Sequence, residues 1–131
     1  MMNKRQKRIF KILQTLALSS EGVKSSRHAA AVVYKGDIVA FGQNSWKTHP
    51  FQSKYSKHEK SVFIHSETHA IYNALKKLTV EELKKCTLYV LRLNKHGVIC
   101  HSKPCEGCSK CIRTFGIKQC FYTSEAGLFV Q

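Results

Sequence analysis

The chain has 131 residues, the length of one domain, and we expect residues 1–131 to form a single unit. A domain of this size can bury a hydrophobic core without disulfides or a structural metal, so a metal site in it would be functional. The chain carries 22 Lys and Arg against 8 Asp and Glu, a formal charge of +14. This excess favours phosphates, nucleotides or nucleic acid as partners.

The N-terminal segment predicts an amphipathic helix and not a membrane span. Apolar residues recur at helical spacing over residues 5–19, but Lys11, Gln14 and Thr15 interrupt the apolar run. The run is too short and too polar for a signal peptide or a bilayer-spanning helix. We therefore expect no membrane partner and a cytoplasmic location.

The rest of the chain alternates between strand and helix signals. Lys35-Gly36-Asp37 predicts the turn of a hairpin. The polar stretch over 42–64 predicts a long loop of the kind that carries function, and 124–131 shows no clear element. The predicted elements are, in chain order, a helix over 5–19, strands over 29–34 and 38–41, a helix over 65–78, a strand over 86–93, a short return strand over 98–100, a helix over 105–115 and a strand over 117–123.

Six cysteines occur, and four of them fall within residues 100–111. No secretory signal precedes them, and a tight cluster with two-residue gaps indicates metal binding in a reducing compartment more than disulfides. Of the remaining two, Cys86 and Cys120 lie in predicted strands and are expected in the core.

Two short motifs at predicted helix starts together suggest a catalytic zinc site. His65, Cys105 and Cys108 would supply one imidazole and two thiolates, which leaves a fourth zinc position open for water. Helix N-termini favour thiolates, and Pro104 suits a first helical turn. Glu67, two residues after His65, can exchange protons with the water without binding the metal. The combination of H-x-E with P-C-x-x-C is the signature of zinc-dependent nucleobase deaminases.

Other interpretations of these residues remain open. His65 and His69 are four residues apart, as in metalloprotease helices, but that motif requires Glu directly after the first His. Cys105, Cys108 and Cys111 could hold an iron–sulfur cluster, which would leave Pro104 and the H-x-E motif unexplained. A non-catalytic zinc module would have no use for a carboxylate beside the metal. We expect Cys111 to be packed, and we assign no role to Cys100 and His101.

On these motifs the chain resembles the cytidine and deoxycytidylate deaminase superfamily, over most of its length. The resemblance implies an α/β fold with three α/β/α layers around a central mixed sheet of four or five strands, and Zn²⁺ as cofactor. It also implies that Asn44 matches the asparagine that contacts the sugar or base, with Ser66 as a second substrate-binding residue. From the residues alone, Asn44 could equally be a loop residue that bonds its own backbone.

The resemblance also bears on the substrate. Relatives that deaminate adenosine in transfer RNA usually have Glu before Pro-Cys, and Lys103 stands there, which favours cytosine. His49 and His58 occur in the long loop without a cysteine, so a second zinc is not expected. Small phage-type deoxycytidylate deaminases are the most similar overall.

The predicted reaction is therefore dCMP to dUMP, or cytidine to uridine, on a free nucleotide or nucleoside. Three loop lysines (Lys47, Lys54 and Lys57) are candidate phosphate ligands, and Trp46 and Phe63 are candidate walls of the base pocket. The alternative is a cytosine or adenine deaminase acting on single-stranded DNA or RNA, whose backbone the basic surface would follow. A homo-oligomer is compatible with either interpretation.

Overall fold

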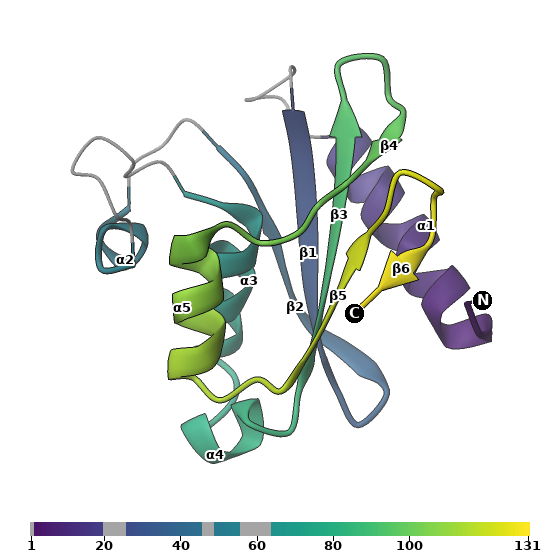
Figure 1. Ribbon diagram of the computed structural model, residues 1–131. Coiled ribbons are helices and arrows are strands. Elements are labelled where there is room, and N and C mark those ends of the chain that lie inside the picture. Colours follow the sequence, from purple (N-terminus) through teal and green to yellow (C-terminus); the bar gives the residue numbers. More distant parts are fainter. Residues whose placement is uncertain (1, 20–25, 46–48, 56–63) are drawn as a thin grey trace.

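The computed structural model describes residues 2–19, 26–45, 49–55 and 64–131. A mixed sheet has the strand order β2-β1-β3-β5-β6, with β4 paired to β3 (Figure 1). β3 runs parallel to β5, and the other pairings are antiparallel. The elements are α1 (Lys4–Leu18), β1 (Ser26–Tyr34), β2 (Asp37–Gln43), α2 (Pro50–Ser53), α3 (Ser66–Ala74), α4 (Val80–Leu83), β3 (Thr87–Asn94), β4 (Ile99–Cys100), α5 (Glu106–Thr114), β5 (Gln119–Thr123) and β6 (Phe129–Val130).

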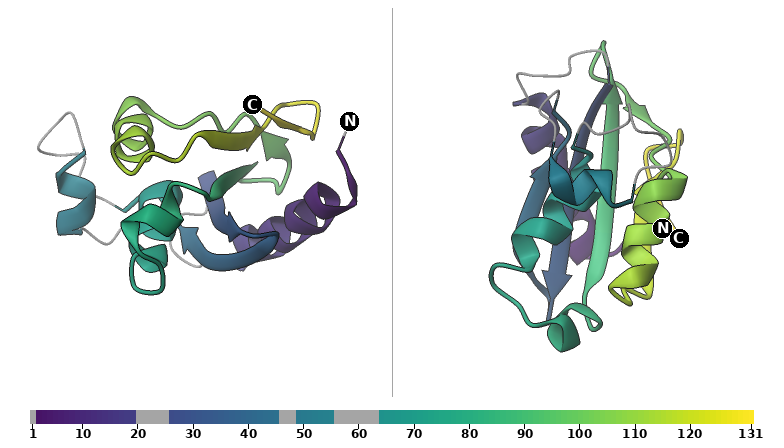
Figure 2. Two further views of the ribbon diagram at one scale, coloured as in Figure 1. Left: turned by 90° about the horizontal axis from the view of Figure 1, so that it is seen from below. Right: turned by 90° about the vertical axis from the view of Figure 1, so that its left-hand side faces the viewer.

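The sheet lies between two helical layers, as the resemblance implied. α1 packs on one face, and α3 and α5 pack on the other (Figures 1 and 2). Successive side chains of a strand point to opposite faces. Ala29 and Ala31 of β1 therefore join the α1 core, while Ala30 and Val32 join the α3/α5 core. β1 and β3 are apolar on both faces because both faces are covered.

The sheet has six strands, not the four or five that were expected. β4 corresponds to the short return strand predicted over 98–100, and the additional strand is β6; each has two residues. β6 lies in the segment 124–131, for which the sequence indicated no element, and it pairs with the end of β5. Strands this short are set by their pairing partner and carry no periodic signal of their own.

Two one-turn helices also differ from the predictions. α2 lies inside the predicted loop; Pro50 is at its start, and the His49 imidazole accepts a hydrogen bond from the Phe51 amide. The predicted helix over 65–78 ends at Ala74, and α4 follows after a capping box formed by Thr79 and Glu82.

Cys86 is buried as expected but lies just before β3. None of the described helices is both long and apolar enough to cross a membrane.

Candidate metal centre and substrate cavity

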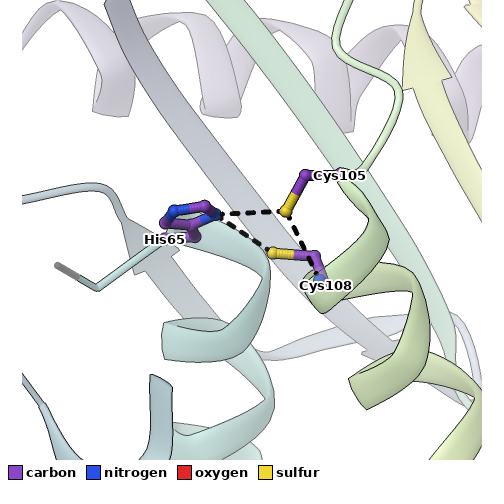
Figure 3. A group of neighbouring side chains, drawn as sticks. All are labelled: His65, Cys105 and Cys108. Carbon is purple, nitrogen blue, oxygen red and sulfur yellow. Dashed lines mark hydrogen bonds between the residues drawn. The ribbon is translucent and has the colours of Figure 1, made fainter. Parts of the chain in front are cut away.

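The N-termini of α3 and α5 meet on the same side of the sheet and bring the three predicted metal ligands together (Figure 3). His65 precedes the first turn of α3, and Cys105 precedes the first turn of α5. The His65 Nδ1 lies 3.6 Å from the Cys105 Sγ and 3.3 Å from the Cys108 Sγ. Residues 40 and more apart in the sequence thus converge on one point.

The spacing of these three atoms fits a tetrahedral zinc ion. Zinc–nitrogen bonds of about 2.0–2.1 Å and zinc–sulfur bonds of about 2.3 Å at the tetrahedral angle place nitrogen and sulfur roughly 3.5 Å apart. The three donor atoms all lie within 4.8 Å of one another, and among the described residues they form the only group of three or more potential ligands. One imidazole and two thiolates also leave a coordination position for water, as catalytic zinc sites do. We refer to His65, Cys105 and Cys108 as the ligand cluster.

The ligand cluster is electrostatically prepared for a cation. Hydrogen bonds from Cys108 and His65 lower the pKa of the Cys105 thiol to about 3. The hydrogen bond to Cys105, followed by burial, raises the pKa of Cys108, and the hydrogen bond to Cys105 raises the pKa of His65. The Cys105 sulfur also accepts from the Cys108 amide at the start of α5. A metal ion would therefore find one thiolate ready and displace a proton from Cys108.

Glu67 lies beside the ligand cluster without belonging to it. Its side chain is 4 % exposed, and the buried Ser66 hydroxyl donates a hydrogen bond of 2.6 Å to its Oε1. Ser66 was predicted to bind substrate, but its hydroxyl proton is donated to the Glu67 carboxylate. This bond uses one of the acceptor positions of the carboxylate, and others remain for proton transfer.

A glycine in β2 sets the position of the H-x-E segment. A Cβ at Gly42 would lie 2.1 Å from the Ser66 carbonyl oxygen and 2.3 Å from the Ala70 amide nitrogen. The backbone of α3 can approach β2 this closely only because no side chain lies between them. Gly42 was not among the predicted site residues, although a glycine inside a strand is a known sign of close backbone approach.

Gln52 is a second contributor that the sequence analysis missed. It lies in α2, is 1 % exposed, and its Oε1 accepts hydrogen bonds from the His65 amide and the Thr68 hydroxyl. The glutamine thus satisfies a free donor at the start of α3. α2 is too short for a periodic signal, so the contribution of Gln52 to the site could not be predicted from the sequence.

The segment before Cys105 is fixed by a buried hydroxyl pair. The Ser102 hydroxyl donates to the Val90 carbonyl oxygen and accepts from the Thr123 amide, and the two hydroxyls lie 2.7 Å apart. Ser102 therefore ties the approach to α5 to both β3 and β5. Cys111, one turn beyond Cys108, is fully buried in the α3/α5 core, as predicted.

A cavity of about 180 Å³ opens next to the ligand cluster. Two members of the cluster, His65 and Cys105, line it, and the other lining residues are His28, Asn44, Ser66, Glu67 and Lys103. The Asn44 side chain accepts from the His28 amide at 2.9 Å and donates to the Ser26 carbonyl at 2.8 Å, so it bridges to β1 and not to its own loop. Burial lowers the pKa of His28, which places a neutral imidazole on this wall at pH 7.

Several predicted contributors are not part of this cavity or fall outside the described residues. Lys54 follows α2 and is exposed, away from the cavity lining. His69 contacts Gln43 of β2 and not the ligand cluster. The remaining candidates lie in the undescribed segments: Trp46, Lys47, Lys57, His58 and Phe63.

Comparison with known proteins agrees with this site. The family model of the cytidine and deoxycytidylate deaminase zinc-binding region matches residues 3–124. The chain therefore belongs to this family of deaminases, and its ligand cluster fits the family's zinc cofactor. No curated protein sequence matched the chain.

Solved structures support the fold. The apo dCMP deaminase from cyanophage S-TIM5 has 22 % identity and a TM-score of 0.65, with 95 % of this chain and 86 % of that chain covered. The complex of the cyanophage enzyme with dCMP and dUMP has 22 % identity and a TM-score of 0.66, with 97 % of this chain and 89 % of that chain covered. Cytidine deaminase from Mycobacterium tuberculosis has 12 % identity and a TM-score of 0.51, with 89 % of this chain and 82 % of that chain covered.

Proposed function

We propose that this deaminase hydrolyses the 4-amino group of cytosine in a free nucleotide, with dCMP as substrate and dUMP as product. The observation that carries the proposal is the cavity beside the ligand cluster, which Glu67 lines on the inside and the exposed Lys103 lines at its edge. One carboxylate and one cation at such a cavity match a substrate with a reactive ring and an anionic group. The cyanophage dCMP deaminase of similar fold was solved with dCMP and dUMP, which supports the same assignment.

In this proposal His65, Cys105 and Cys108 hold the zinc ion, and Glu67 moves the protons. Zinc, when bound, acts as a Lewis acid that makes water nucleophilic at neutral pH. The Glu67 carboxylate takes a proton from the attacking water and delivers it to N3 of the cytosine ring. The same carboxylate then passes the second proton of the water to the leaving amine, so that ammonia departs and the carbonyl of uracil forms.

The remaining lining residues would orient the nucleotide. Asn44 is held by two backbone groups of β1, and that rigidity suits a residue that contacts the sugar. Lys103 immediately precedes Pro104 and Cys105, and its ammonium group would balance the 5′-phosphate. This role replaces the one predicted for Lys54, which is absent from the cavity lining.

The distribution of charge favours a free nucleotide over a polymer. The five basic residues of α1 lie on the opposite face of the sheet from the ligand cluster (Figure 1). A single-stranded substrate needs cations and stacking side chains along a path that leads to the reacting base. Among the described residues, the cavity lining offers one lysine and no aromatic side chain other than histidine rings.

The test compares substrates on the zinc-loaded protein. We expect uracil product from dCMP, with a kcat/KM above that for deoxycytidine and above that for a cytosine-containing oligonucleotide. Lys103→Ala should lower kcat/KM for dCMP by about 10- to 100-fold, the value of a charge-assisted hydrogen bond, and leave deoxycytidine nearly unchanged. Lys110→Ala, on the exposed side of α5, is the matched control.

Three results would contradict the proposal. Turnover of the oligonucleotide but not of dCMP would make the polymer the substrate. Equal losses for dCMP and deoxycytidine in Lys103→Ala would remove the phosphate role from this lysine. No turnover of any cytosine compound by protein with one zinc per chain would reject cytosine deamination.

A further inference from the structure

The layer opposite the ligand cluster carries a groove between α1 and β2 that the deaminase reaction does not use. Its apolar half is a hollow of about 530 Å³ whose lining includes Ile12, Leu16 and Phe41. Phe41 is 40 % exposed and Ile12 is 37 % exposed, so large apolar side chains face the solvent here. Patches of this kind on a soluble protein mark interaction sites.

The groove continues into a cationic half. A second hollow of about 440 Å³ lies against Lys4, Arg5 and Lys35, and Arg8 lines both hollows. One carboxylate, that of Asp37, also lines the second hollow. We call the two hollows together the α1 groove.

The cations of the α1 groove are not explained by the stability of the helix. α1 contains five basic residues and no acidic one, and all five lie in its first eight positions. Positive charges near a helix N-terminus oppose the helix dipole, and like charges three or four residues apart repel one another. Among the described residues, the only ion pair joins Lys84 and Glu81, far from α1 in the sequence. An anionic partner would offset this cost in stability.

We propose that the α1 groove binds an acidic peptide segment of a partner protein, with apolar side chains in the apolar half and carboxylates on the cations. The proposal is independent of the substrate of the deaminase site.

The edge of β2 restricts how the partner binds. Lys77 donates to the Val39 carbonyl and Asn73 to the Phe41 carbonyl, while the His69 ring accepts from the Gln43 amide. These side chains, from α3 and the turn that follows it, occupy backbone groups that an added strand would need. The partner therefore engages side chains in the groove, as an amphipathic helix with anchors at i, i+3 or i+4 does.

Other occupants fit less well. A second copy would bring two sets of α1 cations together, on chains that each carry +14. Single-stranded nucleic acid binds through several stacking aromatic rings, and the part of the α1 groove that the structure describes is lined by one, Phe41. An acidic segment with aliphatic or aromatic anchors complements both halves.

The test is a selection from a random 16-residue peptide library on the zinc-loaded full chain, followed by affinity measurements on the best synthetic peptide. We expect enrichment of peptides that combine Asp or Glu with apolar residues at helical spacing. Arg8→Glu and Phe41→Ser should each weaken binding at least tenfold. Lys118→Glu, with the same charge change, and Val80→Ser, with a similar loss of exposed apolar surface, are the controls. Turnover and the melting temperature verify that each variant is folded.

Three outcomes would overturn the proposal. The first is a selection without enrichment of acidic, apolar-anchored peptides. The second is a selected peptide whose affinity falls equally in the groove variants and the controls. The third is a single-stranded oligonucleotide that binds more tightly than the best peptide and loses affinity in Arg8→Glu, which would make the groove a nucleic-acid site.

Discussion

The N-termini of the three longer helices are built in two different ways. α1 begins with a capping box, in which the Asn3 side chain accepts from the Gln6 amide and the Gln6 side chain accepts from the Asn3 amide. His65 precedes α3, and its side chain makes no capping bond; Cys105 precedes α5, and its sulfur both caps the helix and belongs to the ligand cluster. The first arrangement stabilises a helix, and the second points reactive groups at a common centre.

The difference shows how the protein supports a site on helix ends that lack ordinary caps. Gln52 reaches from α2 to the His65 amide, and the Ser102 hydroxyl fixes the chain that leads to Cys105. Gln52, distant in sequence, thus does for α3 what Gln6 does locally for α1, whereas α5 is capped by the Cys105 sulfur and its approach is held by Ser102. Variants at the two kinds of helix start should therefore fail in different ways.

The largest effect is expected at the ligand cluster. Cys108→Ala removes one of three zinc ligands and should reduce both zinc content and turnover to background. Cys111→Ala, one turn further along α5, should keep one zinc per chain and lose only stability, by about 1 kcal/mol. Zinc content by elemental analysis and turnover on the same preparations test the pair. Stoichiometric zinc in Cys108→Ala would show that the metal is held elsewhere.

A smaller but still large effect is expected at Glu67. Glu67→Gln keeps the shape and the Ser66 contact but cannot carry protons, so we expect full zinc content and a kcat lowered by roughly 10²–10⁴-fold. Stopped-time assays with dCMP, beside zinc analysis, measure both. Turnover near that of the parent chain would remove Glu67 from the mechanism, and loss of zinc would make it a ligand.

The smallest effect is expected at the start of α1. Asn3→Ala removes the capping box and should lower the free energy of unfolding by about 1 kcal/mol. Zinc content and kcat at 25 °C should stay unchanged, because α1 lies across the sheet from the site. Chemical denaturation and the same activity assay check the two halves of this expectation. A parallel loss of activity would mean that α1 is coupled to the ligand cluster.

The sequence predicted the parts of the site that lie in short, local motifs. His65, Glu67, Cys105 and Cys108 could be found because each pair is close in sequence and sits at a helix start. Their convergence required only that the two helices lie on one face of the sheet. The central strands were also predictable, since β1 and β3 are apolar on both faces.

The supporting residues could not be predicted, because their roles depend on pairing between distant segments. Ser102 acts only because β3 and β5 are neighbours, and Gln52 acts only because a single helical turn brings it under α3. One-turn helices and two-residue strands have no period to detect. The bridging of Asn44 to β1 likewise follows from the register of the hairpin, which the residues at the turn do not specify.

The contact at Gly42 makes the metal centre a sensor of the integrity of the sheet. The Ser66 carbonyl and the Ala70 amide rest against β2 with no side chain between them, so α3 cannot shift without the strand. The residues on either side of Ser66 are His65, a proposed zinc ligand, and Glu67, the proposed proton carrier. A substitution at the sheet edge that adds even a methyl group should therefore affect both proposed functions at once. Zinc affinity should therefore depend on the position of β2 against α3, even though β2 supplies no ligand.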